Sequence, residues 1–390
     1  MKNILILAFW FTSISVFSQK IDIALYFDQS VNSVVFSSVT GSYVIIADSN
    51  YFKISKNDVL MITCKGDSVL VKSLNDTLGL FYKVEINGID KDNMFKLKPS
   101  DPSLDARTYD DNLQISSRFR KLLIVNNINI EKYLSGVVEA EGGPKSPIEY
   151  YKSQAVICRT YTFQNIERHT FEGFNLCDGV HCQAYKGKSI QNPEIITATF
   201  ETAGKVIIDT SKTLITATFH SNCGGITEGS ENVWIKSMPY LISKKDDYCI
   251  YQRNAKWEKT IPAEKWKAYL ERYGAQIPAE NYSELFKWNP NGRQMNYTYE
   301  NIKIPLKDIR YDWKLRSAFF SIVPSGDNII LNGRGYGHGV GLCQEGAMKM
   351  AEKGINFEEI IKYYYYNVMI IPIDSIMPET SLINNKHTSE

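Results

Sequence analysis

The stretch Leu134-Ser-Gly-Val-Val-Glu-Ala-Glu-Gly-Gly-Pro144 separates two predicted helices near the middle of a 390-residue chain. Two glycines and a proline follow Glu141, and this combination predicts irregular backbone at its carboxyl group. Catalytic groups concentrate on irregular segments that flanking elements hold in place. We therefore predict that Glu141 is a functional carboxyl group. The competing interpretation is a solvated acid at a helix end.

Helix signals lie on both sides of this stretch. Asn129 can cap a short helix from Ile130 to about Val138. Ser146-Pro-Ile-Glu149 has the pattern of a capping box with proline at the first helical position, which predicts a helix from Ile148 to about Arg168. Cys158 falls on the apolar face of that helix at helical spacing, so we expect it to be a buried small side chain rather than a ligand.

The rest of the chain predicts an α+β fold: a mixed core of antiparallel sheets and a few helices that form a substrate cleft, preceded by a strand-rich segment. Asn356-Phe-Glu-Glu359 is a second capping box, near the C-terminal end of the core. The predicted divisions are a β-rich segment at 19–110, a core at 111–250 and 316–375, an insertion at 251–315 and a disordered tail at 376–390.

The N-terminus and the composition restrict the class of protein. Met1-Lys-Asn precedes an apolar run from Ile4 to Phe17, which predicts a secretory signal over residues 1–18 and an exported protein of the periplasm or cell envelope. An uncleaved membrane anchor is the alternative, but the run is shorter than the roughly 20 residues that a spanning helix requires. The net charge of +1 shows no basic excess and disfavours a nucleic-acid-binding protein.

Cysteine and histidine are concentrated in one short segment. The chain has seven cysteines, and an odd number leaves at least one thiol unpaired or on a metal. Cys177-Asp-Gly-Val-His181-Cys182, with His169 upstream, offers ligands that suit a tetrahedral zinc site. A Cys177–Cys182 disulfide, or thiols that only lie near two histidines, are the alternatives. Because His181 and Cys182 are adjacent, we expect His181 to face the substrate instead of the metal.

Two further motifs contain histidine beside glycine. Phe219-His-Ser-Asn-Cys-Gly-Gly-Ile-Thr-Glu228 carries a glycine pair that permits an unusual turn, which can place His220 at a cleft. A Cys223–Cys249 disulfide and a plain hairpin with a buried cysteine both remain open. Gly333-Arg-Gly-Tyr-Gly-His-Gly-Val-Gly341 presents His338 on a glycine-rich loop, but it lacks the context of a dinucleotide fingerprint.

Taken in order, these segments resemble the SpoIID/LytB family. The resemblance covers roughly residues 117–372, about two-thirds of the chain, and the ordered set is far more specific than any one motif. The matching segments are Tyr133 to Glu141, Tyr151 to Tyr161, His181 to Gly187, His220 to Thr227, Val233-Trp234, Pro239 to Leu241, and Gly335 to Gln344 with Gly346-Ala347.

The resemblance implies a peptidoglycan lytic transglycosylase, which cleaves between N-acetylmuramic acid and N-acetylglucosamine and leaves a 1,6-anhydro end. It assigns the catalytic role to Glu141 rather than Glu139, and a zinc ion to His169, Cys177 and Cys182. The same family also implies an alternative from another class: a non-catalytic glycan-binding protein that activates a cell-wall amidase.

A single carboxyl group suffices for this reaction because the C6 hydroxyl of the sugar attacks and no outside nucleophile is required. We expect a partly apolar cleft to raise the pKa of that carboxyl group. Zinc would shape the cleft rather than activate water. The matching motifs supply the expected substrate-contacting residues, which are His181, Gln183, Tyr185, His220, Thr227, Trp234, Tyr336, His338 and Gln344.

Overall fold

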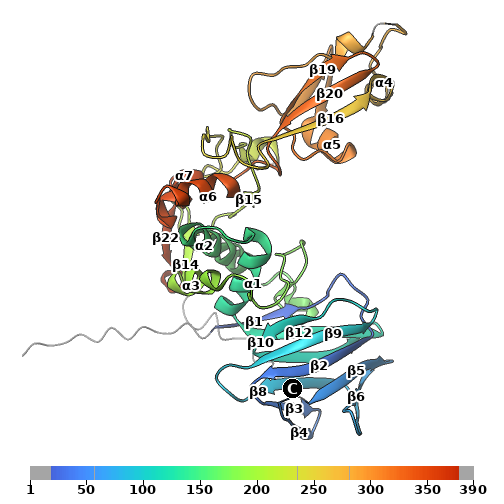
Figure 1. Ribbon diagram of the computed structural model, residues 1–390, viewed down its shortest axis with the longest axis vertical. Helices are drawn as coiled ribbons and strands as arrows, with labels where there is room; N and C mark the ends of the chain where they lie inside the picture. Colours follow the sequence, from blue (N-terminus) through green and yellow to red (C-terminus); the bar gives the residue numbers. More distant parts are fainter. Residues whose placement is uncertain (1–18, 57, 235, 281, 377–390) are drawn as a thin grey trace, which may run out of the picture.

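The computed structural model describes residues 19–376 of the chain except for residues 57, 235 and 281. Three parts follow one another along the long axis of the molecule (Figure 1). A strand-rich part lies at one end, a helical part lies in the middle, and a small part built on β16, β19 and β20 lies at the other end. The predicted signal at 1–18 and nearly all of the predicted tail lie outside the described residues.

The strand-rich part consists of two sheets that pack face to face. In spatial order, one sheet contains β13 (Leu176–Cys177), β1 (Lys20–Ala24), β12 (Lys121–Asn129), β11 (Asn112–Arg118), β8 (Lys83–Gly88), β3 (Tyr43–Ala47) and β4 (Asn50–Ile54). The other contains β10 (Arg107–Asp110), β9 (Met94–Asp101), β2 (Ser33–Thr40), β5 (Val59–Lys65), β6 (Ser68–Lys72) and β7 (Thr77–Phe81).

The two sheets are held together by the buried side chains that each sheet directs at the other. Along β9, every second residue is buried, as expected for a strand with one face on a core. The rings of Phe36, Tyr43 and Phe95 meet between the sheets, with Phe36 stacked on Phe95 at 5.4 Å and edge-on to Tyr43 at 5.5 Å. The predicted strand-rich N-terminal region and the α+β class are confirmed.

Strand β12 leads directly into helix α1 (Ile130–Gly142). The side-chain oxygen of Asn129 accepts the N–H groups of Glu131 and Lys132, so the predicted cap is confirmed. The helix continues past the predicted end at Val138, and Glu141 therefore lies in its last turn. The prediction of irregular backbone at Glu141 was wrong.

Two tyrosines explain why α1 extends so far. The hydroxyl groups of Tyr150 and Tyr151 donate to the carbonyl oxygens of Gly142 (3.2 Å) and Gly143 (3.1 Å). These bonds satisfy carbonyl groups that a helix end otherwise leaves without partners. Gly143 then turns the chain out of the helix at φ 73°, a conformation that favours glycine.

Helix α2 (Ile148–Gln164) follows, and it ends four residues before the predicted boundary. The predicted capping box does not form, because Pro147 occupies the cap position and no side chain caps the helix. Glu149 instead accepts a bond from Lys152 and one from the backbone N–H of Phe357. Cys158 is fully buried, as predicted.

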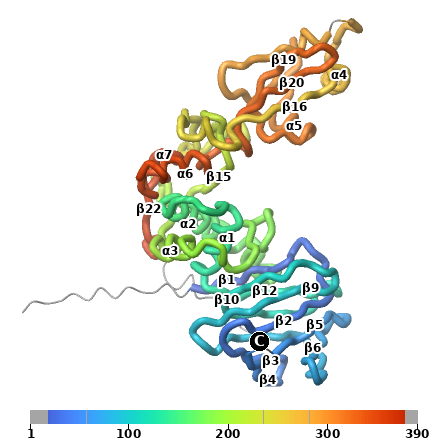
Figure 2. The backbone as a smooth tube through the Cα atoms, in the orientation of Figure 1, coloured from blue at the N-terminus to red at the C-terminus, as the bar shows by residue number. Residues whose placement is uncertain are grey.

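The helical part is completed by segments from the C-terminal half of the chain (Figure 2). Strand β15 (Phe219–His220) pairs in parallel with β21 (Leu342–Cys343), and β14 (Lys205–Ile208) pairs with β22 (Met369–Pro372). Besides α1 and α2, this part contains the helices α3 (Pro193–Glu201), α6 (Gln344–Glu352) and α7 (Phe357–Tyr364). The side chain of Asn356 accepts the N–H of Glu359, so the cap predicted for α7 is confirmed.

The third part has a hydrophobic core of its own, centred on the fully buried Trp266. It contains the sheet β16 (Lys256–Pro262), β20 (Asn328–Arg334) and β19 (Phe320–Ser325), the hairpin β17 (Asn296–Tyr299) and β18 (Ile302–Pro305), and the helices α4 (Ala263–Glu271) and α5 (Leu306–Asp312). Its core reaches Leu331, beyond the predicted insertion at 251–315, because β16 pairs with β20.

Four short 3-10 helices complete the described elements, at Thr170–Glu172, Ser230–Asn232, Tyr282–Phe286 and Ile373–Ser375. In the part of the chain that the structure describes, no helix combines the length and apolar character needed to cross a membrane.

A buried ion pair joins the elements of the helical part. Arg159 on α2 is fully buried and donates two bonds to the carboxylate of Glu131 in the first turn of α1. Its remaining N–H groups donate to the carbonyl oxygens of Thr199 (3.1 Å) and Lys205 (3.2 Å). Glu131 also accepts the backbone N–H of Gly204 at 3.2 Å. The pair therefore ties α1 and α2 to α3 and the start of β14.

Replacing Arg159 should destabilise the fold strongly. Arg159→Met leaves the Glu131 carboxylate buried without its partner, and we expect a loss of about 3–5 kcal/mol in the free energy of unfolding. The control is Lys349→Met, which removes an exposed pair with Glu352 and should cost about 1 kcal/mol or less. Urea unfolding measures both. Equal effects of the two variants would contradict this account.

Candidate active site and metal-binding cluster

Glu141 projects from the last turn of α1 and is half-buried. Its Oε1 accepts the backbone N–H of Ala184 at 2.9 Å, while Oε2 has no hydrogen bond among the described residues. Burial raises the pKa of Glu141, and the Ala184 bond and the positive charge of Lys186 oppose that effect. The group therefore stays protonated to higher pH than an exposed glutamate does, which suits a general acid.

Partial exposure together with the absence of an ion pair distinguishes Glu141 from the three other carboxyl groups whose pKa burial raises. Asp110 and Asp178 each form an ion pair, with Lys188 and Arg107 respectively. Asp246 is fully buried among cysteines. Within the described residues, only Glu141 of these four is both partly accessible and without a cation at ion-pair distance.

Gln344 connects this carboxyl group to the C-terminal motif. Its Nε2 donates to the backbone carbonyl oxygen of Glu141 at 2.8 Å. Gln344 is the first residue of α6 and directly follows β21, which pairs with β15. The predicted residues Glu141 and Gln344 are therefore brought together across about 200 positions of sequence, with His220 on the strand beside β21.

His220 and His338 lie side by side, with ring centroids 5.5 Å apart. The peptide of Val340 bridges them: its carbonyl oxygen lies 3.1 Å from His220 Nδ1, and its N–H donates to His338 Nδ1 at 3.1 Å. Burial lowers the pKa of both imidazoles, to about 4 for His338. Both rings are therefore neutral at pH 7, and His220 Nε2 is buried without a partner among the described residues.

Two aromatic residues of the predicted site lie in accessible positions. Trp234 is half-buried and its ring lies 5.8 Å from that of His338. Tyr336 is 46% exposed. Both can present a ring face or edge to a sugar, as the sequence predicts.

Three other predicted substrate contacts lie inside the protein. Gln183 donates to the carbonyl oxygen of Cys158, and Tyr185 is fully buried with its hydroxyl group on Asn126. Thr227 accepts the N–H of Lys244. The reason is local packing: the ring of Tyr185 lies against Gly136 on α1, where a Cβ would be only 2.6 Å from Cε2. These residues support the site but are not placed to touch a glycan.

The predicted zinc ligands converge, and His181 joins them. The ligand atoms of His169, Cys177, His181 and Cys182 all lie within 4.8 Å of one another. Cys182 Sγ is 3.5 Å from His169 Nε2 and 3.7 Å from His181 Nδ1. Around a tetrahedral zinc ion, neighbouring sulfur and nitrogen ligands are about 3.5–3.8 Å apart. His181 is exposed while its Nδ1 lies with the predicted ligands, so its expected contact with the substrate stays a prediction.

One residue that the sequence analysis missed supports this cluster. The carboxylate of Glu172 lies 2.5 Å from His169 Nδ1 and leaves Nε2 directed at the cysteines. Histidine ligands of metals commonly place their second nitrogen on a carboxylate in this way. The sequence feature that could have identified Glu172 is its spacing of three residues from His169, which puts both residues on one short helical turn.

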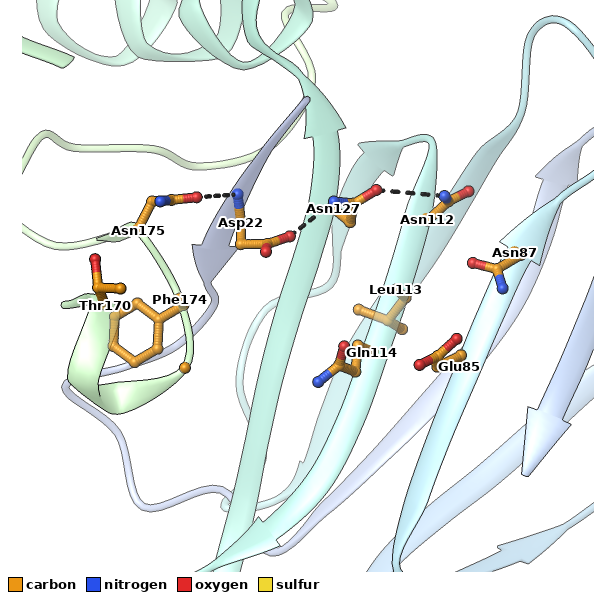
Figure 3. Close-up of a pocket in the computed structure, with 11 residues that line it drawn as sticks. Asp22, Glu85, Asn87, Asn112, Leu113, Gln114, Asn127, Thr170, Phe174 and Asn175 are labelled. Carbon is orange, nitrogen blue, oxygen red and sulfur yellow. Dashed lines mark hydrogen bonds between the residues drawn. The ribbon is translucent and has the colours of Figure 1, made fainter. Parts of the chain in front are cut away.

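A cavity of about 250 Å³ lies on the strand-rich part and not at Glu141 (Figure 3). A row of hydrogen bonds runs along it: Asn112 donates to Asn127, Asn127 donates to Asp22, and the backbone N–H of Asp22 donates to Asn175. None of the residues that the sequence predicts for the functional site lines this cavity. Its only carboxyl groups belong to Asp22 and Glu85.

Comparison with known proteins gives consistent matches. The family model described as SpoIID, stage II sporulation protein, matches residues 118–208. The stage II sporulation protein D of Bacillus amyloliquefaciens is 31% identical over 277 residues, which cover 65% of this chain and 77% of that protein. That of Bacillus subtilis (strain 168) is 30% identical over 269 residues, with the same coverage. The amidase enhancer of Bacillus subtilis (strain 168) is 27% identical over 284 residues, which cover 60% of this chain and 39% of that protein.

Lys186 should control the ionisation of Glu141. Because its positive charge lowers the pKa of Glu141, Lys186→Met should move that pKa further up. Carboxyl-carbon NMR titration, with the resonance assigned through Glu141→Gln, measures the shift. Lys265→Met, an exposed lysine on α4, is the control and should leave the titration unchanged. A lower pKa in Lys186→Met would contradict this electrostatic account.

Proposed function

The chain belongs to the SpoIID/LytB family, and we propose that it is an exported peptidoglycan lytic transglycosylase with Glu141 as its single acid/base. The observation that supports this role most strongly is the combination of burial and a free oxygen at Glu141: the pKa is raised, Oε1 is fixed by Ala184, and Oε2 is available to a substrate. A general acid is favoured by a raised pKa and requires access to the leaving oxygen.

In the proposed reaction, protonated Glu141 gives its proton to the bridging oxygen as the bond from C1 of N-acetylmuramic acid breaks. The leaving N-acetylglucosamine unit departs with a hydroxyl group. The C6 hydroxyl of the same muramic acid then attacks C1, and Glu141, now a carboxylate, takes the hydroxyl proton. A bond from C1 to the C6 oxygen replaces the bond that was broken, no water is consumed, and Glu141 ends protonated.

The half-buried His338 and the accessible aromatic rings supply the proposed binding surface. A neutral imidazole can form a hydrogen bond with a sugar hydroxyl, whereas Nε2 of His220 is buried, so His220 supports His338 from inside the protein. Trp234 and Tyr336 offer apolar surface to a pyranose ring. Gln344 holds the end of α1 through the carbonyl oxygen of Glu141, so it acts as a positioning residue.

We further propose that zinc is held by His169, Cys177, His181 and Cys182, whose donor types and spacing fit a closed structural site. A bound zinc ion would neutralise the two thiolates and fix the conformation of the segment. Ala184, which donates to Glu141 Oε1, lies two residues after Cys182. The cluster therefore holds the backbone N–H that orients the catalytic carboxyl group.

One comparison favours a second candidate function. The similarity to an amidase enhancer is compatible with a non-catalytic protein that binds glycan and activates a cell-wall amidase. Glycan binding without cleavage by the purified chain would favour that role.

The proposed export of the protein depends on the signal pattern at residues 1–18 of the sequence.

Glu141→Gln tests the catalytic role. Glutamine keeps the size of the side chain but can neither give nor take the proton, so we expect anhydro-muramic ends to disappear from digests of denuded glycan while the melting temperature stays near that of the wild type. Mass spectrometry of the products measures the loss. Glu194→Gln, an exposed acid on α3, is the control and should keep full activity. Wild-type turnover by Glu141→Gln would exclude the assignment.

Cys182→Ser tests the zinc site. Serine is a poor zinc ligand, so the variant should lose one zinc ion per chain and most of its activity, because Ala184 is no longer held against Glu141. Zinc content and turnover are measured together, with Cys64→Ser as the control outside the cluster. Unchanged zinc content in Cys182→Ser would argue against this ligand set.

A further inference from the structure

A second group of metal-ligand side chains lies apart from the first one. Cys223, Asp246, Cys249 and Cys343 are each fully buried. Their ligand atoms all lie within 4.8 Å of one another. The four residues come from three segments that are far apart in the sequence, so their meeting is a property of the fold.

The separations match those of ligands around one ion. Cys223 Sγ lies 3.3 Å from Cys249 Sγ and 3.3 Å from Asp246 Oδ2. Cys343 Sγ accepts the backbone N–H of Cys223 at 3.3 Å, which directs it to the same point. Tetrahedral zinc with thiolate ligands at about 2.3 Å places neighbouring sulfur atoms about 3.8 Å apart, so a small expansion of this cluster would admit the ion.

The carboxyl group of Asp246 is oriented by its neighbours. Its Oδ1 accepts the N–H of Tyr248, and its Oδ2 accepts the hydroxyl group of Tyr364, both at 3.0 Å. No lysine or arginine of the described residues forms an ion pair with Asp246. A fully buried carboxylate without a cation is costly, and a metal ion among three thiolates would supply the missing positive charge.

A guanidinium group stands next to the cluster. Arg293 donates to the carbonyl oxygen of Cys223 at 2.7 Å and forms an ion pair with Glu228 at 3.3 Å. Three thiolates and one carboxylate around a divalent ion carry a net charge of about −2, from the charges of the ligand types. A cation beside the ligand backbone offsets part of that charge.

We propose that Cys223, Asp246, Cys249 and Cys343 form a second, structural zinc site. Three thiolates and one carboxylate in a closed, buried arrangement are ligands that select zinc over the hard cations magnesium and calcium. On binding, the three thiol groups each lose a proton to solvent, no bond is oxidised or reduced, and the ion completes four coordination positions.

The position of this site indicates its task. Cys343 immediately precedes Gln344, which donates to the carbonyl oxygen of Glu141. Cys223 lies three residues after His220, and Asp246 and Cys249 lie on the irregular segment between Leu241 and β16. Zinc would therefore hold the two histidine motifs and the start of α6 in one arrangement against the end of α1.

A disulfide is the competing use of these cysteines. A Cys223–Cys249 bond would join two of them but would leave Cys343 and the buried carboxylate of Asp246 without partners. Four convergent ligands are therefore better explained by an ion than by a disulfide. This inference does not depend on the first cluster or on the proposed reaction.

Native mass spectrometry of the full chain, purified without added reductant and then supplied with zinc, tests the proposal. We expect two zinc ions per chain and no disulfide in the wild type, and one ion in Cys343→Ser. Cys182→Ser should also retain one ion, and Cys64→Ser should retain two. A zinc content in Cys343→Ser equal to that of the wild type, or a Cys223–Cys249 disulfide in the wild-type peptide map, would overturn the proposal.

A second measurement needs no variant and covers the case in which Cys343→Ser does not fold. Cadmium NMR of the cadmium-loaded wild type should give two resonances, because cadmium bound by three thiolates and a carboxylate differs from cadmium bound by two thiolates and two imidazoles. A single resonance with the character of the mixed thiolate–imidazole site would overturn the second site. That result would not contradict the first zinc site or the proposed reaction.

Discussion

The buried pair between Glu131 and Arg159 is the constraint on which the geometry of the proposed active site depends. It fixes the start of α1 against α2, and its remaining hydrogen bonds reach the end of α3 and the strand that follows. A buried ion pair is compatible with a stable fold only when its geometry and remaining hydrogen bonds are satisfied, and here the carbonyl groups of Thr199 and Lys205 and the N–H of Gly204 satisfy it. Because α1 is a rigid helix of 13 residues, fixing its start also sets the place of Glu141 at its end.

The functional groups around Glu141 come from segments with little regular structure. Ala184 and His338 lie on segments of turns and isolated bridges, and His220 lies on the two-residue strand β15. Few backbone hydrogen bonds of helices or sheets hold such segments, so other links have to position them. The two ligand clusters lie where these links are required: one is next to Ala184 and the other is next to Gln344 and His220. We propose that metal binding supplies this rigidity, while the chemistry belongs to the carboxyl group.

The sequence pattern predicted correctly those features that depend on contacts between residues close in the sequence. The caps at Asn129 and Asn356 and the burial of Cys158 follow from neighbouring residues, and all three are confirmed. The backbone at Glu141 could not be predicted in this way, because the hydroxyl groups of Tyr150 and Tyr151 extend α1 from outside it. The burial of Tyr185 and the inclusion of His181 in the cluster depend on how the 169–187 segment folds over α1, which spacing alone does not reveal. The order of the motifs in the sequence identified the family and predicted Glu141 as the functional carboxyl group. The directions of the side chains could be determined only from the structure.

In the proposed reaction, the C6 hydroxyl of the substrate, and not water, replaces the leaving sugar. Digestion of denuded glycan by the wild-type chain in water enriched in heavy oxygen, followed by mass spectrometry, tests it most directly. The proposed reaction should give anhydro-muramic ends that carry no label. Reducing ends that carry the heavy isotope would contradict it, because they would identify a hydrolase in which water is the nucleophile.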